Sequence, residues 1–491
     1  MTVADRRDTT ETWTVASELG ASLTVARARG GRSTLVATTL PVDALDPIDL
    51  YAAARGLGFE AAIWIEPAAD RSIVGIGRAW AVEVGGVDRF VAARAAWRDL
   101  LADALVVGDT TASAQTGPIL LGGLGFSGLT PEAGDPWAAF GPASLVLPTF
   151  GVVQGRGAAN LTVAIAPDRE GDPDPDEVAA AWDALAAGAS GHRASMDAPP
   201  GTLQTPTTEP GGSRVIDERP DRAEWERTVG LFAGAVGRGR IDKVVLARRV
   251  VLRSTADLDV VAALRHLART APESSTFAFV RDGTTFLGAT PERLVRTRGR
   301  WFETAAIAGS AARGRDPAED ARFAAALLAS EKDREEHAVV VDMLRTSLTP
   351  IVEVLHVADA PAILPLRHLQ HLVTPLTGTL CDEAGLLALA GQLHPTPAVG
   401  GAPRDVALAL IAEHEAFDRG WYAGPIGWLG PDGDGEMMVA LRCGLVRGRE
   451  ATLFAGCGIV ADSDPSREWE ESRLKLRTMI AALGGIAEDD P

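Results

Sequence analysis

The chain has few cysteines and no long apolar run, and each absence excludes a class of protein. Cys381, Cys443 and Cys457 are the three cysteines among 491 residues, and their spacing matches neither a zinc site nor a disulfide framework. The N-terminal residues lack the apolar core of a signal peptide, and no apolar stretch is long and uncharged enough to span a bilayer. We therefore expect a soluble protein of the reducing cytoplasm without a membrane partner.

The chain also lacks an excess of positive charge. Its formal net charge of -19 argues against nucleic acid or an anionic membrane as the main partner. An anionic small substrate stays compatible, because cations in a pocket outweigh a diffuse surface field. Hydrophobic residues at 46% and charged residues at 23% are typical of an ordinary globular protein. No oligomerisation element stands out, so a monomer is the default expectation.

Short β-branched runs between glycine-rich turns predict a mixed α/β fold, mostly sheet in its first third. Residues 23–26 and 61–65 are two such runs, and residues 92–105 form the clear helix among them. From residue 224 onward, helix and strand patterns become denser. We divide the chain into a frayed N-terminus at 1–12, an N-terminal half at 13–193, a linker or exposed loop at 194–220, a catalytic region at 221–485 and a tail at 486–491.

One glycine-rich segment imitates a dinucleotide-binding loop. Gly123, Gly125 and Gly128 have the GxGxxG spacing, but such a loop must open a helix. Pro131 and Pro136 follow and prevent a long helix. The segment instead indicates a strand in which glycine permits close backbone packing.

The residues from 457 to 480 predict an acidic helix. Asp464 followed by Pro465 is a helix start, and Glu468, Glu471 and Lys475 then fall on one face at i, i+3 and i+7. Taken alone, such a face is more often a solvated, salt-bridged surface.

A second acidic helix changes that balance. The segment from Ser330 to Asp333 fits a capping box that opens a helix running to about Leu348. Glu336 lies in its first turns, beside His337. Glu336 and Glu471, on separate helices, could together hold one hard cation through oxygen ligands.

Three further charged residues stand next to apolar strands. Lys243 opens the strand 243–252, where burial would push its ammonium towards neutrality. Residues 276–280 and 285–290 predict a hairpin across Asp282-Gly283, and Glu292 follows it. Arg442 lies in apolar company, where a buried guanidinium needs a carboxylate partner. Lys243 and Glu292 each have an alternative interpretation, as a solvated or structural charge.

His368 and His371 lie three residues apart, a spacing that also occurs in zinc sites. No third nitrogen or sulfur ligand lies nearby in the sequence, so zinc is disfavoured. The segment 394–403 is too rich in proline and glycine to form a helix or strand and predicts a rigid loop.

Taken in order, these segments resemble those of the chorismate-utilising enzymes, and most closely the isochorismate synthases. The resemblance covers residues 224–480 and rests on the following motifs: KVVLAR from Lys243, GATPE ending at Glu292, IAGS ending at Ser310, EKDREEH around Glu336, LQHL around His371, LHPTPAVGG around Ala398, RGWYAGP around Tyr422, LR ending at Arg442, and the helix from Glu468 to Lys475.

The resemblance implies a fold of extensive antiparallel sheets in a sandwich flanked by helices. It also implies a Mg²⁺ cofactor that holds the ring carboxylate of chorismate. Glu336 and Glu471 resemble its ligands, and Glu468 a nearby or water-mediated one.

The resemblance further implies proton-transfer roles for two residues. Lys243 resembles the general base that activates water for attack at C2 of chorismate, and Glu292 the general acid that protonates the departing C4 hydroxyl. The other family positions that contact the substrate are matched by Gly309, Ser310, His371, Ala398, Tyr422, Arg442, Gly458 and Lys475, with Tyr422 and Arg442 at the enolpyruvyl carboxylate.

Departures from sister activities favour one reaction. Ala308 stands where aminodeoxychorismate synthases of one type have a nucleophilic lysine, and Lys243 stands where anthranilate synthases usually have an amide. Ala398 stands where salicylate synthases tend to have threonine. Ser310 keeps the hydroxyl of the commoner threonine.

The resemblance therefore implies an isomerase, an isochorismate synthase. A salicylate synthase is the alternative within the enzymes, and a non-catalytic chorismate-binding paralogue is the alternative outside them. One active site serves both the menaquinone and siderophore pathways, so the destination of the product stays open.

Overall fold

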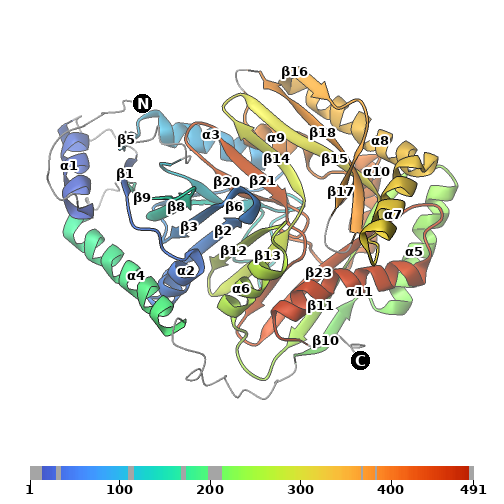
Figure 1. Ribbon diagram of the computed structural model, residues 1–491, viewed down its shortest axis with the longest axis horizontal. Coiled ribbons are helices and arrows are strands. Elements are labelled where there is room, and N and C mark those ends of the chain that lie inside the picture. Colours follow the sequence, from blue (N-terminus) through green and yellow to red (C-terminus); the bar gives the residue numbers. More distant parts are fainter. Residues whose placement is uncertain are drawn as a thin grey trace.

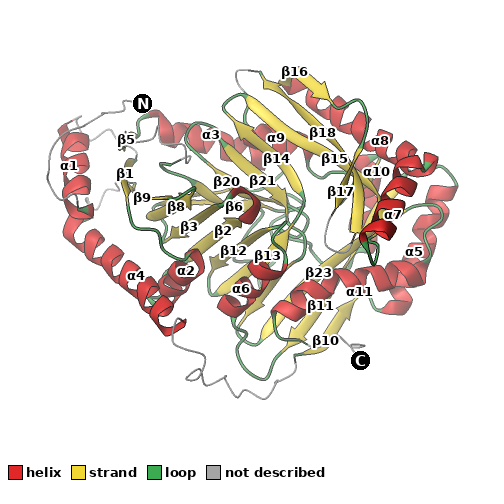
Figure 2. Cartoon of the chain, in the orientation of Figure 1, coloured by secondary structure: helices red, strands yellow, loops and turns green. Residues whose placement is uncertain are grey.

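The computed structural model describes residues 14–28, 35–108, 116–166, 173–196, 213–365, 369–381 and 384–485. In this part of the chain, two large and mostly antiparallel sheets are flanked by helices (Figure 1, Figure 2). The mixed fold expected from the sequence is confirmed. None of the helices described combines the length and the apolarity that crossing a bilayer requires.

The helices are α1 (Val15–Ala28), α2 (Pro47–Gly56), α3 (Arg89–Ala102), α4 (Pro175–Met196), α5 (Arg222–Gly237), α6 (Val260–Thr270), α7 (Pro317–Ala329), α8 (Glu331–Leu348), α9 (Leu386–Leu393), α10 (Arg404–His414) and α11 (Pro465–Ala482), with 3-10 turns η1 (Pro67–Ala69) and η2 (Thr349–Ile351).

The larger sheet contains, in spatial order, β10 (Arg214–Arg219), β11 (Lys243–Arg253), β23 (Glu450–Ile459), β22 (Cys443–Arg447), β13 (Thr284–Thr290), β12 (Ser275–Arg281), β2 (Ala61–Glu66), β3 (Arg71–Ile76), β8 (Phe150–Gly155), β9 (Ala158–Ile165), β1 (Val36–Pro41) and β5 (Leu105–Val107), with β19 (Gly401–Ala402) beside β11. The β1–β5 pair is parallel.

The smaller sheet contains, in spatial order, β16 (Val352–Val357), β18 (Leu369–Leu380), β15 (Trp301–Ala312), β14 (Arg293–Arg298), β21 (Gly435–Val439), β20 (Pro425–Leu429), β6 (Leu120–Leu124), β7 (Ala143–Leu147) and β4 (Trp80–Glu83), with β17 (Ala362–Pro365) beside β18. Strands from residues 13–193 and from residues 221–485 thus lie side by side in both sheets. The domain boundaries proposed from the sequence stay predictions.

The two sheets face one another across one apolar core. Trp64 of β2 and Phe277 of β12 belong to it from the larger sheet, and Leu121 of β6 and Trp428 of β20 from the smaller sheet. A second core covers the other face of the larger sheet, where α1, α2, α4, α6 and α11 pack. Because α11 is anchored in this second core, its first turns are held at one end of the larger sheet.

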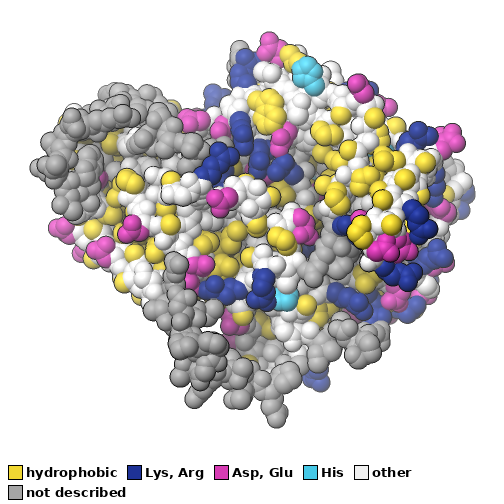
Figure 3. Space-filling model, viewed as in Figure 1, with side chains coloured by type: hydrophobic (Ala, Val, Ile, Leu, Met, Phe, Trp, Pro, Cys, Tyr) yellow, Lys and Arg dark blue, Asp and Glu magenta, His cyan; other side chains and the backbone are white. Residues whose placement is uncertain are grey.

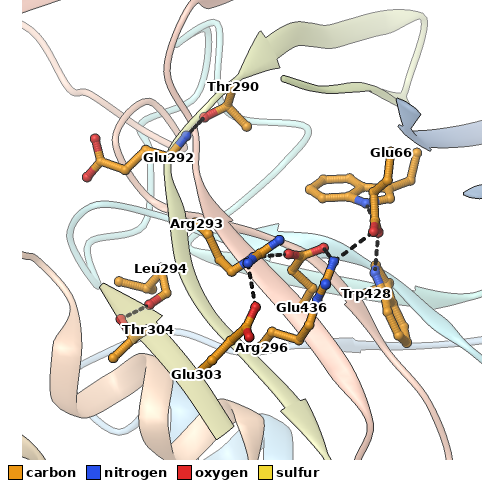
Figure 4. Close-up of polar contacts among 11 residues, drawn as sticks. Glu66, Thr290, Glu292, Arg293, Leu294, Arg296, Glu303, Thr304, Trp428 and Glu436 are labelled. Carbon is orange, nitrogen blue, oxygen red and sulfur yellow. Dashed lines mark hydrogen bonds and ion pairs between the residues drawn. The ribbon is translucent and has the colours of Figure 1, made fainter. Parts of the chain in front are cut away.

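A buried network of charges also joins the two sheets (Figure 4). Arg296 of β14 binds Glu66 of β2 at 2.9 Å and Glu436 of β21 at 3.0 Å. The indole nitrogens of Trp64 and Trp428 donate to the same oxygen of Glu66 at 2.8 and 3.2 Å. This network was not predicted from the sequence, because its members lie on strands far apart in the chain.

Elements with strong local signals form where they were predicted. The hairpin of β12 and β13 turns at Asp282 and Gly283, both with positive φ. Ser330 caps α8 by accepting a hydrogen bond from the Asp333 amide at 3.2 Å. The helix predicted at residues 92–105 begins and ends three residues earlier, as α3.

The strand predicted at residues 23–26 is wrong, because these residues lie in α1. Leu19, Leu23 and Ala26 are buried at helical spacing, whereas Thr24 and Val25 are exposed. A four-residue β-branched run is too short to separate the two periods. Residues 214–219, assigned to the linker, form β10 against β11. Residues 197–212 of that linker, and both predicted tails, lie outside the described residues.

Both signs of charge occur on the surface. On the face drawn in Figure 3, acidic and basic side chains are both present, and several basic side chains gather in the upper middle of the view. The net charge of -19 therefore does not prevent a locally positive environment.

The glycine-rich segment is a strand only at its start: Gly123 lies in β6, which ends at Leu124, whereas Gly125 and Gly128 follow the strand and pack closely against backbone. At Gly122 a Cβ atom would lie 2.0 Å from the backbone oxygen of Ser144 on β7, and φ is +154°. We expect Gly122→Ala to lower the free energy of unfolding by about 1–3 kcal/mol or more, because backbone cannot move aside. Chemical denaturation measures this change.

Gly230→Ala is the matched control. Gly230 lies in α5 with no atom within 4 Å of its Cβ position, so alanine should raise stability by up to about 1 kcal/mol. Equal stability of the two variants would contradict the close packing assigned to β6.

Candidate active site

The pairing of β11 with β23 brings the two ends of the catalytic region together. Val244 pairs with Ile459 and Val245 with Gly458, so Lys243 at the start of β11 lies beside the end of β23. The chain then turns from β23 into α11. Lys243 and the acidic face of α11 therefore meet at one edge of the larger sheet.

The start of α11 follows from its sequence. Asp464 accepts a hydrogen bond from the Arg467 amide at 2.9 Å, and Pro465 occupies the first turn. Lys475 binds Glu471 at 2.7 Å and donates to the Gly456 carbonyl of β23 at 2.8 Å. The same-face arrangement predicted for Glu471 and Lys475 is thus present.

Arg248 of β11 holds α11 against the sheet. Its guanidinium lies 3.6 Å from the ring centre of Trp469 and donates to Ser472 at 3.1 Å and to Glu218 at 2.9 Å. The side chain is only 1% exposed. The sequence does not predict this role, because a lone arginine in a strand carries no signal for a partner on a distant helix.

Lys243 is half-buried, and its stem packs across a glycine. A Cβ atom on Gly458 would lie 2.4 Å from Cε of Lys243, so glycine at this position leaves room for the lysine. Burial lowers the pKa of Lys243, Glu336 opposes that change and Lys475 reinforces it. No described residue forms a hydrogen bond with the ammonium group.

Glu292 follows β13, and its side chain points away from the charged network that its neighbour Arg293 joins (Figure 4). Its amide donates to Thr290 at 3.4 Å. Burial raises the pKa of Glu292, and Lys243, Lys475 and Arg442 oppose that change. The environment therefore favours a protonated carboxyl near a lysine that is driven towards neutrality.

Arg442 interacts electrostatically with both Tyr422 and Glu292. Arg442 has a left-handed backbone, with φ of 48°, and burial lowers its pKa while Tyr422, Glu471 and Glu292 raise it. Arg442 makes no ion pair with any described residue, so the carboxylate partner expected for it stays a prediction. Tyr422 is buried, stacks on Phe454 at 5.3 Å, and has a pKa raised by burial.

Gly309, Ser310 and His371 form one edge of the site on the smaller sheet. The β15–β18 register shifts between Ala308 and Ser310, and Gly309 has a φ of 76°, as expected for a bulge. Ser310 Oγ lies 2.7 Å from Nδ1 of His371 on the paired strand. Burial lowers the pKa of His371. The charges of Lys475 and Arg442 lower this pKa further, and the charge of Glu471 raises it. His368 lies outside the described residues.

Two of the predicted metal ligands lie together. One oxygen each of Glu468 and Glu471, with Sγ of Cys457, fall within 4.8 Å of one another. Burial raises the pKa of the Cys457 thiol to about 12, which leaves oxygen as the donor and suits a hard cation such as Mg²⁺.

Glu336, on α8, lies outside that group of three, although its charge raises the pKa of Lys243. Its neighbour His337 is buried and contacts Thr374 at 2.6 Å. His337 is therefore a structural residue of α8.

Ala398 lies in the loop after α9. His394 holds this loop by contacting the carbonyl of Phe126 at 3.0 Å. Ala398 lines a small cavity together with Glu292 and with Val340 and Leu344 of α8. The loop predicted at 394–403 thus borders Glu292, but the prediction that it contains no strand is wrong at its end, where Gly401 and Ala402 form β19 against Lys243 and Val244 of β11.

Comparison with known proteins identifies the family. The family described as chorismate binding enzyme matches residues 21–484. The chain belongs to the chorismate-binding enzymes. Within this family it is 38% identical to the salicylate biosynthesis isochorismate synthase of Pseudomonas aeruginosa, over 93% of this chain and 92% of the relative.

Two further chorismate-binding enzymes resemble the whole chain. Isochorismate synthase MenF of Bacillus subtilis is 32% identical over 92% of this chain and 94% of its own. The solved structure of MenF, the menaquinone-specific isochorismate synthase of Escherichia coli, matches with a TM-score of 0.73 and 26% identity, over 94% of this chain and all of that one.

The scarcity of lysine in the sequence is a further signal for the site. The chain has three lysines, Lys243, Lys332 and Lys475, and two of them lie at the site. Arginine carries the other positive charges, and it cannot release a proton near neutral pH. Where lysine is this scarce, a lysine at a strand start indicates chemistry more strongly than it would in an average chain.

We expect Lys243 to titrate at lower pH than the other two lysines. The hydrogen bond with Asp462 raises the pKa of Lys332, and Cys457 and Glu471 raise that of Lys475 although burial lowers it. Competitive acylation over a pH series, read by mass spectrometry, measures all three in one sample. If Lys243 titrated at the same pH as Lys332, the desolvation of Lys243 would be contradicted. In urea, where the chain is unfolded, the pKa values of all three lysines should converge at about 10.4.

Proposed function

We propose that this chorismate-binding enzyme is an isochorismate synthase, which transfers the ring hydroxyl of chorismate from C4 to C2. One observation carries the proposal: burial lowers the pKa of Lys243 and raises the pKa of Glu292. The charge of each residue opposes the effect of burial on the other. Hydroxyl exchange needs one group that accepts a proton and another that gives one. The relative named for salicylate biosynthesis and the solved structure named for menaquinone are both called isochorismate synthases.

Each role follows from the environment of the residue. Lys243 accepts the proton of the water that attacks C2, because burial favours its neutral form. Glu292 gives its proton to the oxygen that leaves C4, because burial favours its protonated form. Arg442, which has no ion pair with a described residue, binds a carboxylate of the dianionic substrate, and Tyr422 lies beside it.

Glu336, Glu468 and Glu471 would hold Mg²⁺, which when bound neutralises a carboxylate of the substrate. Lys475 pairs with Glu471 at 2.7 Å. It therefore orients the Glu471 carboxylate on α11. The three cysteines are all unpaired, which supports a reducing compartment such as the cytoplasm.

Product analysis tests the function. Incubation of the protein with chorismate and Mg²⁺ should give isochorismate, and Lys243→Ala should lower kcat by about a hundredfold to ten-thousandfold with chorismate binding retained. Chromatographic separation of the products and calorimetric binding measure both. Salicylate plus pyruvate as the main product would contradict the synthase assignment. Chorismate binding without turnover in the wild type would indicate a non-catalytic paralogue, and undiminished turnover in Lys243→Ala would remove the base assignment.

A matched pair of variants tests the metal ligands. Glu471→Gln should weaken Mg²⁺ binding by at least about tenfold, because an oxygen ligand loses its charge. Glu470→Gln changes the neighbouring carboxylate, which is half exposed and pairs with Arg473 at 3.3 Å, and should leave the affinity unchanged. Isothermal titration of the protein with Mg²⁺ measures both. An equal loss in the two variants would indicate a general field effect and not a ligand.

A further inference from the structure

An ion pair joins the two acidic helices of the site. Lys332, in the first turn of α8, binds Asp462 in the turn between β23 and α11. No other hydrogen bond or ion pair connects α8 with residues 460–482 in the part of the chain that the structure describes. α8 packs on β15 of the smaller sheet, whereas α11 packs on β23 of the larger one (Figure 1). The Lys332–Asp462 pair is therefore a bridge between two separately anchored helices.

The α8 end of this bridge lies on the same face as a proposed metal ligand. Ser330 caps the turn that carries Lys332. Glu336 follows Lys332 by four residues and therefore shares its face of the helix. The hydrogen bond with Asp462 raises the pKa of Lys332, and the charge of Glu336 adds to this rise. The face of α8 that carries Glu336 is thus the face turned towards the start of α11.

The α11 end of the bridge is a closed turn. The Ser463 amide donates to the Val460 carbonyl at 3.1 Å, and the Val460 amide donates to Ser463 Oγ at 3.1 Å. Burial raises the pKa of Glu468, and a hydrogen bond with Ser463 opposes this rise. Asp462 therefore lies in a turn that is tied to one of the proposed metal ligands of α11.

Without a cation, the carboxylates of the two helices repel one another. Glu336 belongs to α8, and Glu468 and Glu471 belong to α11, so their like charges favour separation of the helices. Mg²⁺ requires oxygen ligands in a near-ideal octahedron at about 2.0–2.1 Å. Ligands on helices that have moved apart must first be brought together, and this ordering lowers the affinity. A contact that holds the helices together in advance reduces that loss.

We propose that the Lys332–Asp462 pair is this contact: it holds α8 and α11 together in the metal-free protein, so that the three glutamates are near one another before the cation binds. Lys332 and Asp462 are then positioning residues and touch neither metal nor substrate. The inference rests on the proposed function, which assigns the metal to these glutamates. Both partners are exposed, at 60% and 62%, so salt screens the pair and its contribution to metal affinity is modest.

Substitution of Lys332 separates this role from a direct effect of charge. If the ammonium acted on the metal directly, its removal would strengthen Mg²⁺ binding. We expect the opposite: Lys332→Met should raise the Kd for Mg²⁺ about threefold to fivefold, whereas Lys332→Arg, which keeps the pair, should not. Asp462→Asn should give the same rise, and the double variant should bind no more weakly than either single variant. Isothermal titration with Mg²⁺ at low salt, without chorismate, measures all of these.

Arg345→Met is the matched control. Arg345 lies on the same helix, is 51% exposed and pairs with Asp342 at 2.9 Å, so its loss removes an equal charge and an exposed ion pair but no link to α11. Its Kd for Mg²⁺ should equal that of the wild type. Amide hydrogen exchange gives a second readout. In the metal-free protein the first turns of α8 should exchange faster in Lys332→Met than in the wild type, and saturating Mg²⁺ should remove the difference.

Three results would each overturn the proposal. Lys332→Met could bind Mg²⁺ as tightly as the wild type or more tightly, Arg345→Met could lose as much affinity as Lys332→Met, or the losses of the two single variants could add up in the double variant. Failure of the proposed function is read separately, as absence of isochorismate from a wild type whose Mg²⁺ affinity responds to Lys332→Met as expected.

Discussion

The ladder between β11 and β23 is the constraint on which the site depends. It pairs ten residues in sequence, from Val244 with Ile459 to Arg253 with Glu450. Lys243 is separated from the residues of α11 by more than two hundred positions, yet this register sets them side by side. A shift by one residue would turn Lys243 to the other face of the sheet. Arg248, in the same ladder, fixes α11 through Trp469 and Ser472.

Desolvation gives the two central groups their different properties. A lysine and a glutamate that meet in water form an ordinary ion pair, with the proton on the lysine. Burial disfavours both charges, and at Lys243 and Glu292 it opposes the attraction between them. Arg442 keeps its charge through the same burial because a guanidinium does not deprotonate. In the proposed mechanism the site therefore combines a fixed positive charge for binding with two groups whose protonation can change for proton transfer.

Local signals in the sequence predicted much of the site. Asp464-Pro465, Ser330 and Asp282-Gly283 fix backbone hydrogen bonds within a few residues, and each formed its predicted turn or helix start. The order of motifs from Lys243 to Lys475 identified the family. Contacts set only by tertiary structure were missed, among them the contacts of Arg248 with Trp469 and Ser472 of α11 and the network of Glu66, Arg296 and Glu436. The run at residues 23–26 shows the opposite error, where four β-branched and apolar residues were too few to reveal the period of α1.

Both sheets mix strands from the two ends of the chain, and this arrangement bears on how the protein is made. β12 of the catalytic region pairs with β2, and β20 pairs with β6. A ribosome releases β2 and β6 long before their partners, so their edges wait unpaired, and unpaired edges are the surfaces on which chains aggregate. A fragment beginning at residue 221 would carry all the proposed catalytic groups but leave β12 and β20 with open edges. Assembly of the active site is thus a late, whole-chain event in folding.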